Sequence, residues 1–415
     1  MADIAGSASA MLALWLIGAA LSLVGALVYA ELASSWPGAG GDYTFLVRAY
    51  GRSVGFLYAW ARGTVICTGS IALLAYILGD YLTRLHDLGT HSPAIYAAIA
   101  VVALTSMNLA GLKASSKLQN TLATLEIGAV LAVALVGLLV APSADVTGAA
   151  APSAPAAGAL GLAMVFVLLT FGGWNEAAYV SAEVRGGPRA ILRTLLASIA
   201  VITLLYLLFV AGALHALGFE GLRRSEAVGI DVIESAFGTY GAQLIGIAVA
   251  IASLTSMNAT LIVGARSNYA LARDWRALAF MASWRGERGV PVAGLLLQGA
   301  IALALVLFGA LEKDGFATMV EFTAPVFWLF FMLSGIALFV LRRREPDVYR
   351  PYRVPLFPVL PVVFVLTCAG LLYSSIAYAR SHHAGFVALV VLAGGAVVLL
   401  ALRRAEAARR RQRPG

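Results

Sequence analysis

The stretch LLTFGGWNEAAYVSAE, residues 168–183, lies inside one of the most apolar segments of this chain. Gly172 and Gly173 each weaken a helix by about 1 kcal/mol relative to alanine. An acidic side chain, as at Glu176, costs roughly 2.5–3.5 kcal/mol at the centre of a bilayer. Such unfavourable residues near the middle of an apolar span require a reason, either an interruption of the helix or close packing against a neighbouring helix.

The composition of the whole chain is that of an integral membrane protein. Of its 415 residues 61% are hydrophobic and 12% are charged, whereas soluble domains have roughly half and a quarter. Eleven apolar segments are long enough to cross about 30 Å of hydrocarbon, and each must be a helix because open sheet edges do not occur in lipid. These segments are residues 8–32, 55–82, 93–109, 121–140, 158–180, 191–216, 242–262, 290–311, 318–341, 356–378 and 386–402.

The basic residues concentrate in the connections on one side of these spans. They cluster in residues 48–52, 113–117, 185–193, 266–288 and 342–353 and after residue 401. The positive-inside rule makes this side cytoplasmic, with the C-terminus inside. The net charge of +8 therefore reflects topology, and we expect no nucleic-acid partner. The expected organisation is one transmembrane domain over residues 1–415, with an external linker at 142–158 and a basic cytoplasmic tail at 403–415.

The cysteine, histidine and serine residues of this sequence are not spaced as in catalytic or metal-binding sites. Cys67 and Cys368 lie in separate apolar runs, and His382 and His383 have no further ligand nearby in sequence. Neither a disulfide framework nor a metal site is predicted. The sequence has no Ser–His pairing in a credible span and no nucleotide-binding loop, so we expect neither an enzyme nor a bound cofactor.

Four motifs carry a resemblance to a known family. They are FGGWNEAAYVSAEVRGGPRAILR from Phe171, YAELASSWPGAGGDYTFLVRAYG from Tyr29, NATLIVGARSNYALARD from Asn258 and LRRREPDVYRPYRVPLFPVLP from Leu341. In this order they resemble the amino acid–polyamine–organocation permeases, particularly the bacterial branch similar to the L-type amino acid transporters. The resemblance covers nearly the whole chain. It implies an all-α, LeuT-like fold of two inverted five-helix repeats, and secondary active transport of amino acids across the bacterial cytoplasmic membrane by alternating access.

The resemblance also implies that the first of the family's twelve helices is absent. The segment 158–180 corresponds to the family's sixth span but is the fifth here, so the eleven spans match family spans two to twelve. Two interpretations stay open: a start codon chosen too late, or a degenerate permease that acts as a sensor or assembly partner without transporting. The external loop TRLHDLGTHSP contains no cysteine, so no disulfide-linked heavy chain is expected.

In the family, substrate binds at the membrane midplane between two broken helices, which places the site at the glycine pair. Gly172 and Gly173 permit unwinding, and the freed backbone groups can hold the carboxylate and ammonium of an amino acid. Trp174 would wall the pocket, and Asn175 would bind substrate or the unwound backbone. The alternative is a glycine pair for close helix packing, with Asn175 bonded to a neighbouring helix.

Aromatic residues supply further candidates for the substrate site. Phe171 could form part of a gate, and Phe327 and Trp328 could line the pocket from another span. Packing against lipid or core is the alternative for Phe327 and Trp328. None of the pocket candidates is a counter-ion for a cationic side chain, so a neutral amino acid is the expected substrate.

The candidates for ion coupling lie in two other spans. Many relatives have a lysine at the position of Glu126, where its ammonium takes the place of a sodium ion. A buried carboxylate could instead carry a proton, or form a structural pair with Arg62. Arg62 itself is expected to snorkel to the cytoplasmic face, with contact to the substrate carboxylate as the alternative. Ser256 and Asn258 could contribute to an ion site or only to helix packing.

Overall fold

The computed structural model describes residues 5–411 except 39, 111–115, 141–156, 181–186, 226, 276–277, 280–291, 313 and 380–383. The described residues fold into helices and contain no strand, which confirms the all-α prediction. The elements are α2 (Ala8–Ser35), α3 (Asp42–Tyr50), α4 (Arg52–Ala61), the π-helix η1 (Arg62–Ile66), α5 (Cys67–Leu85), α6 (Ser92–Leu109), α7 (Ser116–Leu139), α8 (Ala157–Thr170), the 3-10 helix η3 (Trp174–Val180), α9 (Gly187–Arg224), α10 (Val228–Asp274), α11 (Val292–Gly309), α12 (Gly315–Arg344), α13 (Val359–Ala379) and α14 (Ala384–Arg411).

Ten helices of the described chain are long and apolar enough to cross a membrane. They coincide with ten of the eleven predicted spans, and α4, η1 and α5 together form one of them, Arg52–Leu85. The eleventh predicted span is divided into α8 and η3, neither of which is long enough to cross a bilayer alone. Most of the predicted linker 142–158 lies outside the described residues, whereas α14 extends through the predicted tail to Arg411.

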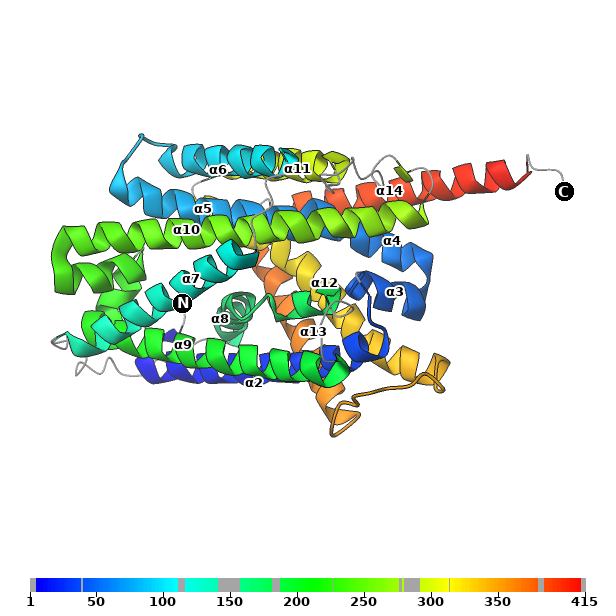
Figure 1. Cartoon of the computed structure of the whole chain (residues 1–415), viewed down its shortest axis with the longest axis horizontal. Coiled ribbons are helices and arrows are strands. Elements are labelled where there is room, and N and C mark those ends of the chain that lie inside the picture. The colour runs from blue at the N-terminus through cyan, green and yellow to red at the C-terminus, as the bar shows by residue number, and fades with distance from the viewer. Residues whose placement is uncertain are drawn as a thin grey trace.

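Most of the long helices run roughly parallel to the long axis of the molecule, whereas α12 and α13 cross it obliquely (Figure 1). α10 packs against α5 and α7, α7 packs against α9, and α12 packs against α13. The short helix α8 contacts α2 and α13, and η3 contacts α2 and α9. The interrupted span is therefore surrounded by continuous helices, which supply the packing that its two short halves cannot provide themselves.

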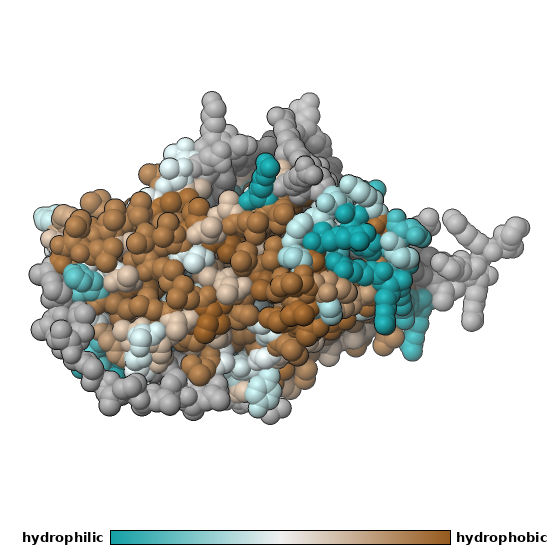
Figure 2. Space-filling view, turned by 90° about the horizontal axis from the view of Figure 1, so that it is seen from below, coloured by the Kyte–Doolittle hydropathy of each residue, from teal (hydrophilic) through white to brown (hydrophobic). Residues whose placement is uncertain are grey.

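The outer surface has the pattern expected of a protein in lipid. Figure 2 shows apolar side chains over the middle of the molecule and hydrophilic ones gathered at one end, the end where α3 and the C-terminal part of α14 lie in Figure 1. Large apolar residues such as Leu204, Leu244 and Leu366 are exposed on this surface. In a membrane these side chains would contact hydrocarbon instead of water, which removes the cost of their exposure.

A buried carboxylate joins three segments at the hydrophilic end. Glu31, near the end of α2, is fully buried. It accepts hydrogen bonds from Arg342 Nε at 2.8 Å, from Arg342 Nη2 at 2.6 Å and from the backbone N–H of Val354 at 2.6 Å. The pair fixes α2 to the end of α12 and to the segment that follows it.

Replacing Glu31 with glutamine is expected to destabilise the fold strongly. The change leaves the Arg342 guanidinium partly buried without its counter-charge, which typically costs about 3–5 kcal/mol. Thermal unfolding in detergent measures the effect. The matched control is Glu220→Gln, because Glu220 forms ion pairs with Arg223 and Arg224 in which all three side chains are exposed, and such pairs contribute about 0–1 kcal/mol. Equal melting temperatures for the two variants would contradict this role of Glu31.

Candidate functional site

The backbone leaves helical geometry between Thr170 and Trp174. α8 ends at Thr170, residues 171–173 form a turn, and the chain resumes as η3 at Trp174. Gly173 has a φ of +99°, in the region that favours glycine. A Cβ on Gly172 would lie 2.8 Å from the carbonyl oxygen of Leu169. The interruption predicted from the glycine pair is confirmed, and it leaves backbone groups at the end of α8 and the start of η3 without intrahelical partners.

A cavity lies beside this break. Gly172 and Trp174 contribute to its wall from the break, and Phe327 and Trp328 contribute from α12. These four residues were all predicted to bind substrate, and the structure brings them together. The cavity has a volume of about 20 Å³, which is room for about one water molecule.

Aromatic rings close the cavity on one side. Tyr29 lies 5.3 Å from Trp174 and 5.3 Å from Phe331 between ring centroids, and Phe331 lies 5.8 Å from Phe364. Of these four residues only Tyr29 is absent from the cavity wall. The packing is edge-to-face or tilted, the arrangement that aromatic quadrupoles favour. Widening the cavity at this wall therefore requires one of these rings to move.

Two polar groups in the cavity wall have no hydrogen-bond partner among the described residues. They are the Ser22 hydroxyl on α2 and the Trp328 indole N–H on α12, and both are buried. Buried polar groups are nearly always hydrogen-bonded, so two unbonded ones on residues that line one cavity indicate a place for a polar ligand or water. Trp328 was predicted to line the pocket but not to act as a donor, and Ser22 was not predicted, because a single serine in an apolar span has no distinguishing pattern.

The other predicted substrate residues lie around the break without lining this cavity. The Phe171 ring packs against Trp15 and Tyr206, with centroids 5.8 and 5.2 Å away. Asn175 is 4% exposed in the first turn of η3, and Gly173 is exposed at the break itself. Their roles in binding or gating stay predictions.

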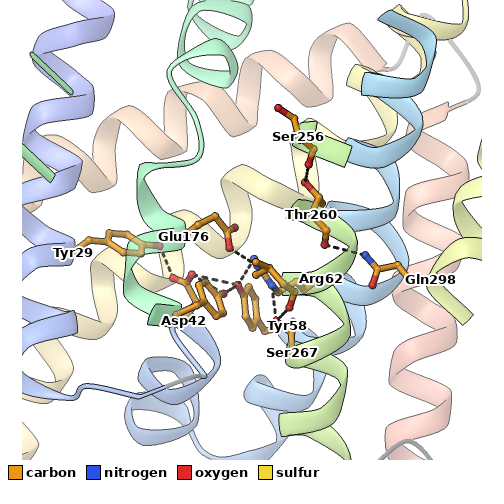
Figure 3. A network of polar contacts seen from close by, with 11 residues as sticks. Tyr29, Asp42, Tyr58, Arg62, Glu176, Ser256, Thr260, Ser267 and Gln298 are labelled. Carbon is orange, nitrogen blue, oxygen red and sulfur yellow. Dashed lines mark hydrogen bonds and ion pairs between the residues drawn. The ribbon is translucent and has the colours of Figure 1, made fainter. Parts of the chain in front are cut away.

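Arg62 points into the helix bundle. It is 3% exposed, its Nη2 lies 2.7 Å from Glu176 Oε2, and its Nε donates to Ser267 Oγ at 3.0 Å (Figure 3). Its guanidinium lies 4.1 Å from the centroid of the Tyr179 ring. The prediction that Arg62 snorkels to the cytoplasmic face is wrong, because a carboxylate inside the bundle neutralises it. The proposed pair with Glu126 is also wrong, since Glu176 takes that place.

Asp42 connects η3 to three other spans. It is buried at the start of α3 and accepts hydrogen bonds from Tyr29 at 2.5 Å, Ser334 at 2.7 Å, Tyr179 at 3.0 Å and Tyr58 at 3.3 Å. The hydroxyls of Tyr58 and Tyr179 also bond to each other. Asp42 was not among the predicted site residues, although an acid between a glycine pair and an aromatic residue was an available signal.

Two of the three coupling candidates line one cavity, and the third lies in a contact between helices. Glu126 on α7 and Ser256 on α10 line a second cavity of about 220 Å³, together with Ser253. Asn258 does not line it and instead accepts a hydrogen bond from Asn108 at 2.7 Å, which joins α10 to α6. Asn258 thus has a helix-packing contact, whereas Glu126 and Ser256 face the same space.

Comparisons with known proteins agree on one family. The model for the amino acid permease family matches residues 2–400. The b(0,+)-type amino acid transporter 1 of Mus musculus is 24% identical over 391 residues, which cover 92% of this chain and 78% of the mouse protein. The cystine/glutamate transporter of Homo sapiens is 24% identical over 396 residues, covering 94% and 77%. The human large neutral amino acids transporter small subunit 2 is 25% identical over 382 residues, covering 90% and 70%.

Replacing Gly173 with alanine is expected to distort the break. Its positive φ costs an L-residue about 1–2 kcal/mol, so the variant should melt at a lower temperature and lose activity. The control is Gly370→Ala. Gly370 is a helical residue of α13 with open space around its Cβ position, so alanine is favoured there by about 1 kcal/mol. A Gly173→Ala protein as stable as Gly370→Ala would show that the break does not need its left-handed residue.

Proposed function

This chain belongs to the amino acid permease family, and we propose that its substrate is a neutral amino acid bound at the break between α8 and η3. Family membership and the transporters it resembles make it a multi-pass membrane protein that transports amino acids, and not an enzyme. The substrate class, the coupling ion and the membrane orientation are parts of the proposal. The basic connections support a cytoplasmic C-terminus.

The observation that carries the proposal is the pair of unbonded polar groups in the cavity wall. Leaving a buried donor without an acceptor costs about 1–3 kcal/mol. A substrate carboxylate would accept hydrogen bonds from the Ser22 hydroxyl and the Trp328 N–H, which belong to residues that line one cavity with Gly172. The N-terminus of η3 adds favourable partial positive charge for a carboxylate, and the last carbonyls of α8 suit an ammonium group.

The rest of the cavity wall supports a substrate with a neutral side chain. Aromatic rings from Phe327, Phe331 and Phe364 make up much of the wall, and none of the described residues that line it is charged. A charged side chain would lose its hydration there without gaining a partner. Because about 20 Å³ is too small for an amino acid, this conformation is a closed one, and transport requires the cavity to widen in another state.

We propose a proton as the coupling ion and Glu126 as its carrier. Glu126 is half-buried within a span and faces a cavity that also contains Ser253 and Ser256. An ionisable group at such a position is a candidate for a proton pathway by default. Obligatory exchange of one amino acid for another is the alternative mechanism, and it would require no proton carrier.

Removing the indole donor should weaken substrate binding selectively. In proteoliposomes, Trp328→Phe is expected to raise the KM for a neutral amino acid such as leucine by about two- to tenfold, the equivalent of one hydrogen bond. Trp275→Phe is the control, because Trp275 is also buried but does not line the cavity. An unchanged KM in Trp328→Phe would contradict binding at this cavity. A panel of neutral, acidic and basic competitors then tests the substrate class.

Replacing Glu126 with glutamine should abolish accumulation driven by a proton gradient while leaving exchange intact. Glutamine keeps the shape of the side chain but cannot take up a proton at neutral pH. Uptake against a concentration gradient, with and without an imposed pH difference, measures this. Glu234→Gln, which changes an exposed acid of α10, is the control. Undiminished accumulation in Glu126→Gln would remove Glu126 from the coupling mechanism.

A further inference from the structure

We propose that Glu176 sets the charge selectivity of transport by neutralising Arg62, and thereby excludes amino acids with acidic side chains. This inference rests on the proposed binding site at the break. It adds a specificity-determining residue that does not line the cavity in the closed conformation. The selectivity depends on which partner neutralises each of three charged groups, Arg62, Glu176 and Asp42.

Arg62 carries a permanent charge in a place where a charge needs a partner. Guanidinium groups stay protonated in proteins, and a buried ion without a counter-charge is strongly unfavourable. Glu176 at 2.7 Å supplies that counter-charge. The other groups in contact with Arg62 are neutral: the Ser267 hydroxyl at 3.0 Å, the Tyr58 hydroxyl at 3.5 Å and the Tyr179 ring.

The second carboxylate of this region is already engaged by other donors. Asp42 accepts hydrogen bonds from three tyrosine hydroxyls and one serine hydroxyl. These donors stabilise its negative charge without an arginine. The neutralisation of Arg62 therefore depends on Glu176.

Glu176 is placed where a substrate could compete with it. It lies on the broken segment two residues after Trp174, which lines the cavity, and its N–H donates to the carbonyl oxygen of Gly173 at 3.0 Å. Its side chain is 39% exposed, whereas that of Arg62 is 3% exposed. The Glu176 carboxylate is therefore accessible, whereas the Arg62 guanidinium that it contacts is not. The backbone of Glu176 is hydrogen-bonded to Gly173 at the break.

This arrangement has opposite consequences for the two kinds of charged substrate. An acidic side chain entering beside η3 would meet the negative charge of Glu176 and find Arg62 occupied. Replacing Glu176 with glutamine preserves the shape but leaves Arg62 uncompensated, and a guanidinium is well suited to bind a carboxylate in two places. Replacing Arg62 with glutamine instead frees the carboxylate of Glu176, which would favour a cationic side chain.

The experiment is competition for uptake of a labelled neutral amino acid in proteoliposomes. Glutamine and glutamate are the first pair of competitors, because they have the same shape and differ in charge. The wild type should be inhibited by glutamine at far lower concentrations than by glutamate. In Glu176→Gln, the half-inhibitory concentration of glutamate relative to that of glutamine should fall by about tenfold or more, the equivalent of about 1.4 kcal/mol. The double variant Glu176→Gln with Arg62→Gln should lose this gain.

The single variant Arg62→Gln provides an independent test in the opposite direction. Lysine should become a competitor and glutamate should not. If the ion pair only braces η3, both variants would slow uptake of every substrate equally, with unchanged competition ratios, and the proposal would be overturned. Equal inhibition of the wild type by glutamine and glutamate would also overturn it. Absence of any neutral amino acid uptake by the wild type would instead mark failure of the proposed function.

Discussion

A helix can stop inside a membrane only where the surrounding protein replaces the hydrogen bonds that the helix gives up. The break between α8 and η3 lies among α2, α9 and α13, and the hydroxyl of Tyr206 on α9 donates to the carbonyl oxygen of Thr170 at 3.0 Å. η3 is also held by polar contacts, from Tyr179 to Asp42 and from Glu176 to Arg62. The bundle around the break therefore provides what a stable interruption requires. The contacts of Asp42 and Arg62 hold η3 in place within it.

The fold was largely predictable from sequence because its main constraint is local. Twenty apolar residues must form a helix in lipid whatever their neighbours are, so hydropathy located ten spans, and a glycine pair located the break. The direction of Arg62 was not predictable in this way. It depends on which face of the helix meets the bundle, and the π-helix that begins at Arg62 changes that face.

The candidate site was predictable only in part, for a related reason. Gly172 and Trp174 belong to one short motif, whereas the donors of Asp42 come from residues 13 to 292 positions away along the chain. No periodicity links such partners, and single residues such as Ser22 have no local signal. The position of the Phe171 ring, away from the cavity, was not predictable either. Its place in the sequence beside the glycines does not determine which side of α8 the ring occupies.

The same few side chains connect the cavity to the ionic contacts beneath it. The Trp174 ring packs against Tyr29, whose hydroxyl donates to Asp42, and Asp42 in turn binds Tyr179 on η3. Widening the cavity at this wall would displace a ring of this cluster, and Trp174 is the first residue of η3. If substrate binds at the break as proposed, its binding is linked to the contacts that hold η3. Separating those contacts requires free energy that only the substrate, or a coupled ion, can supply.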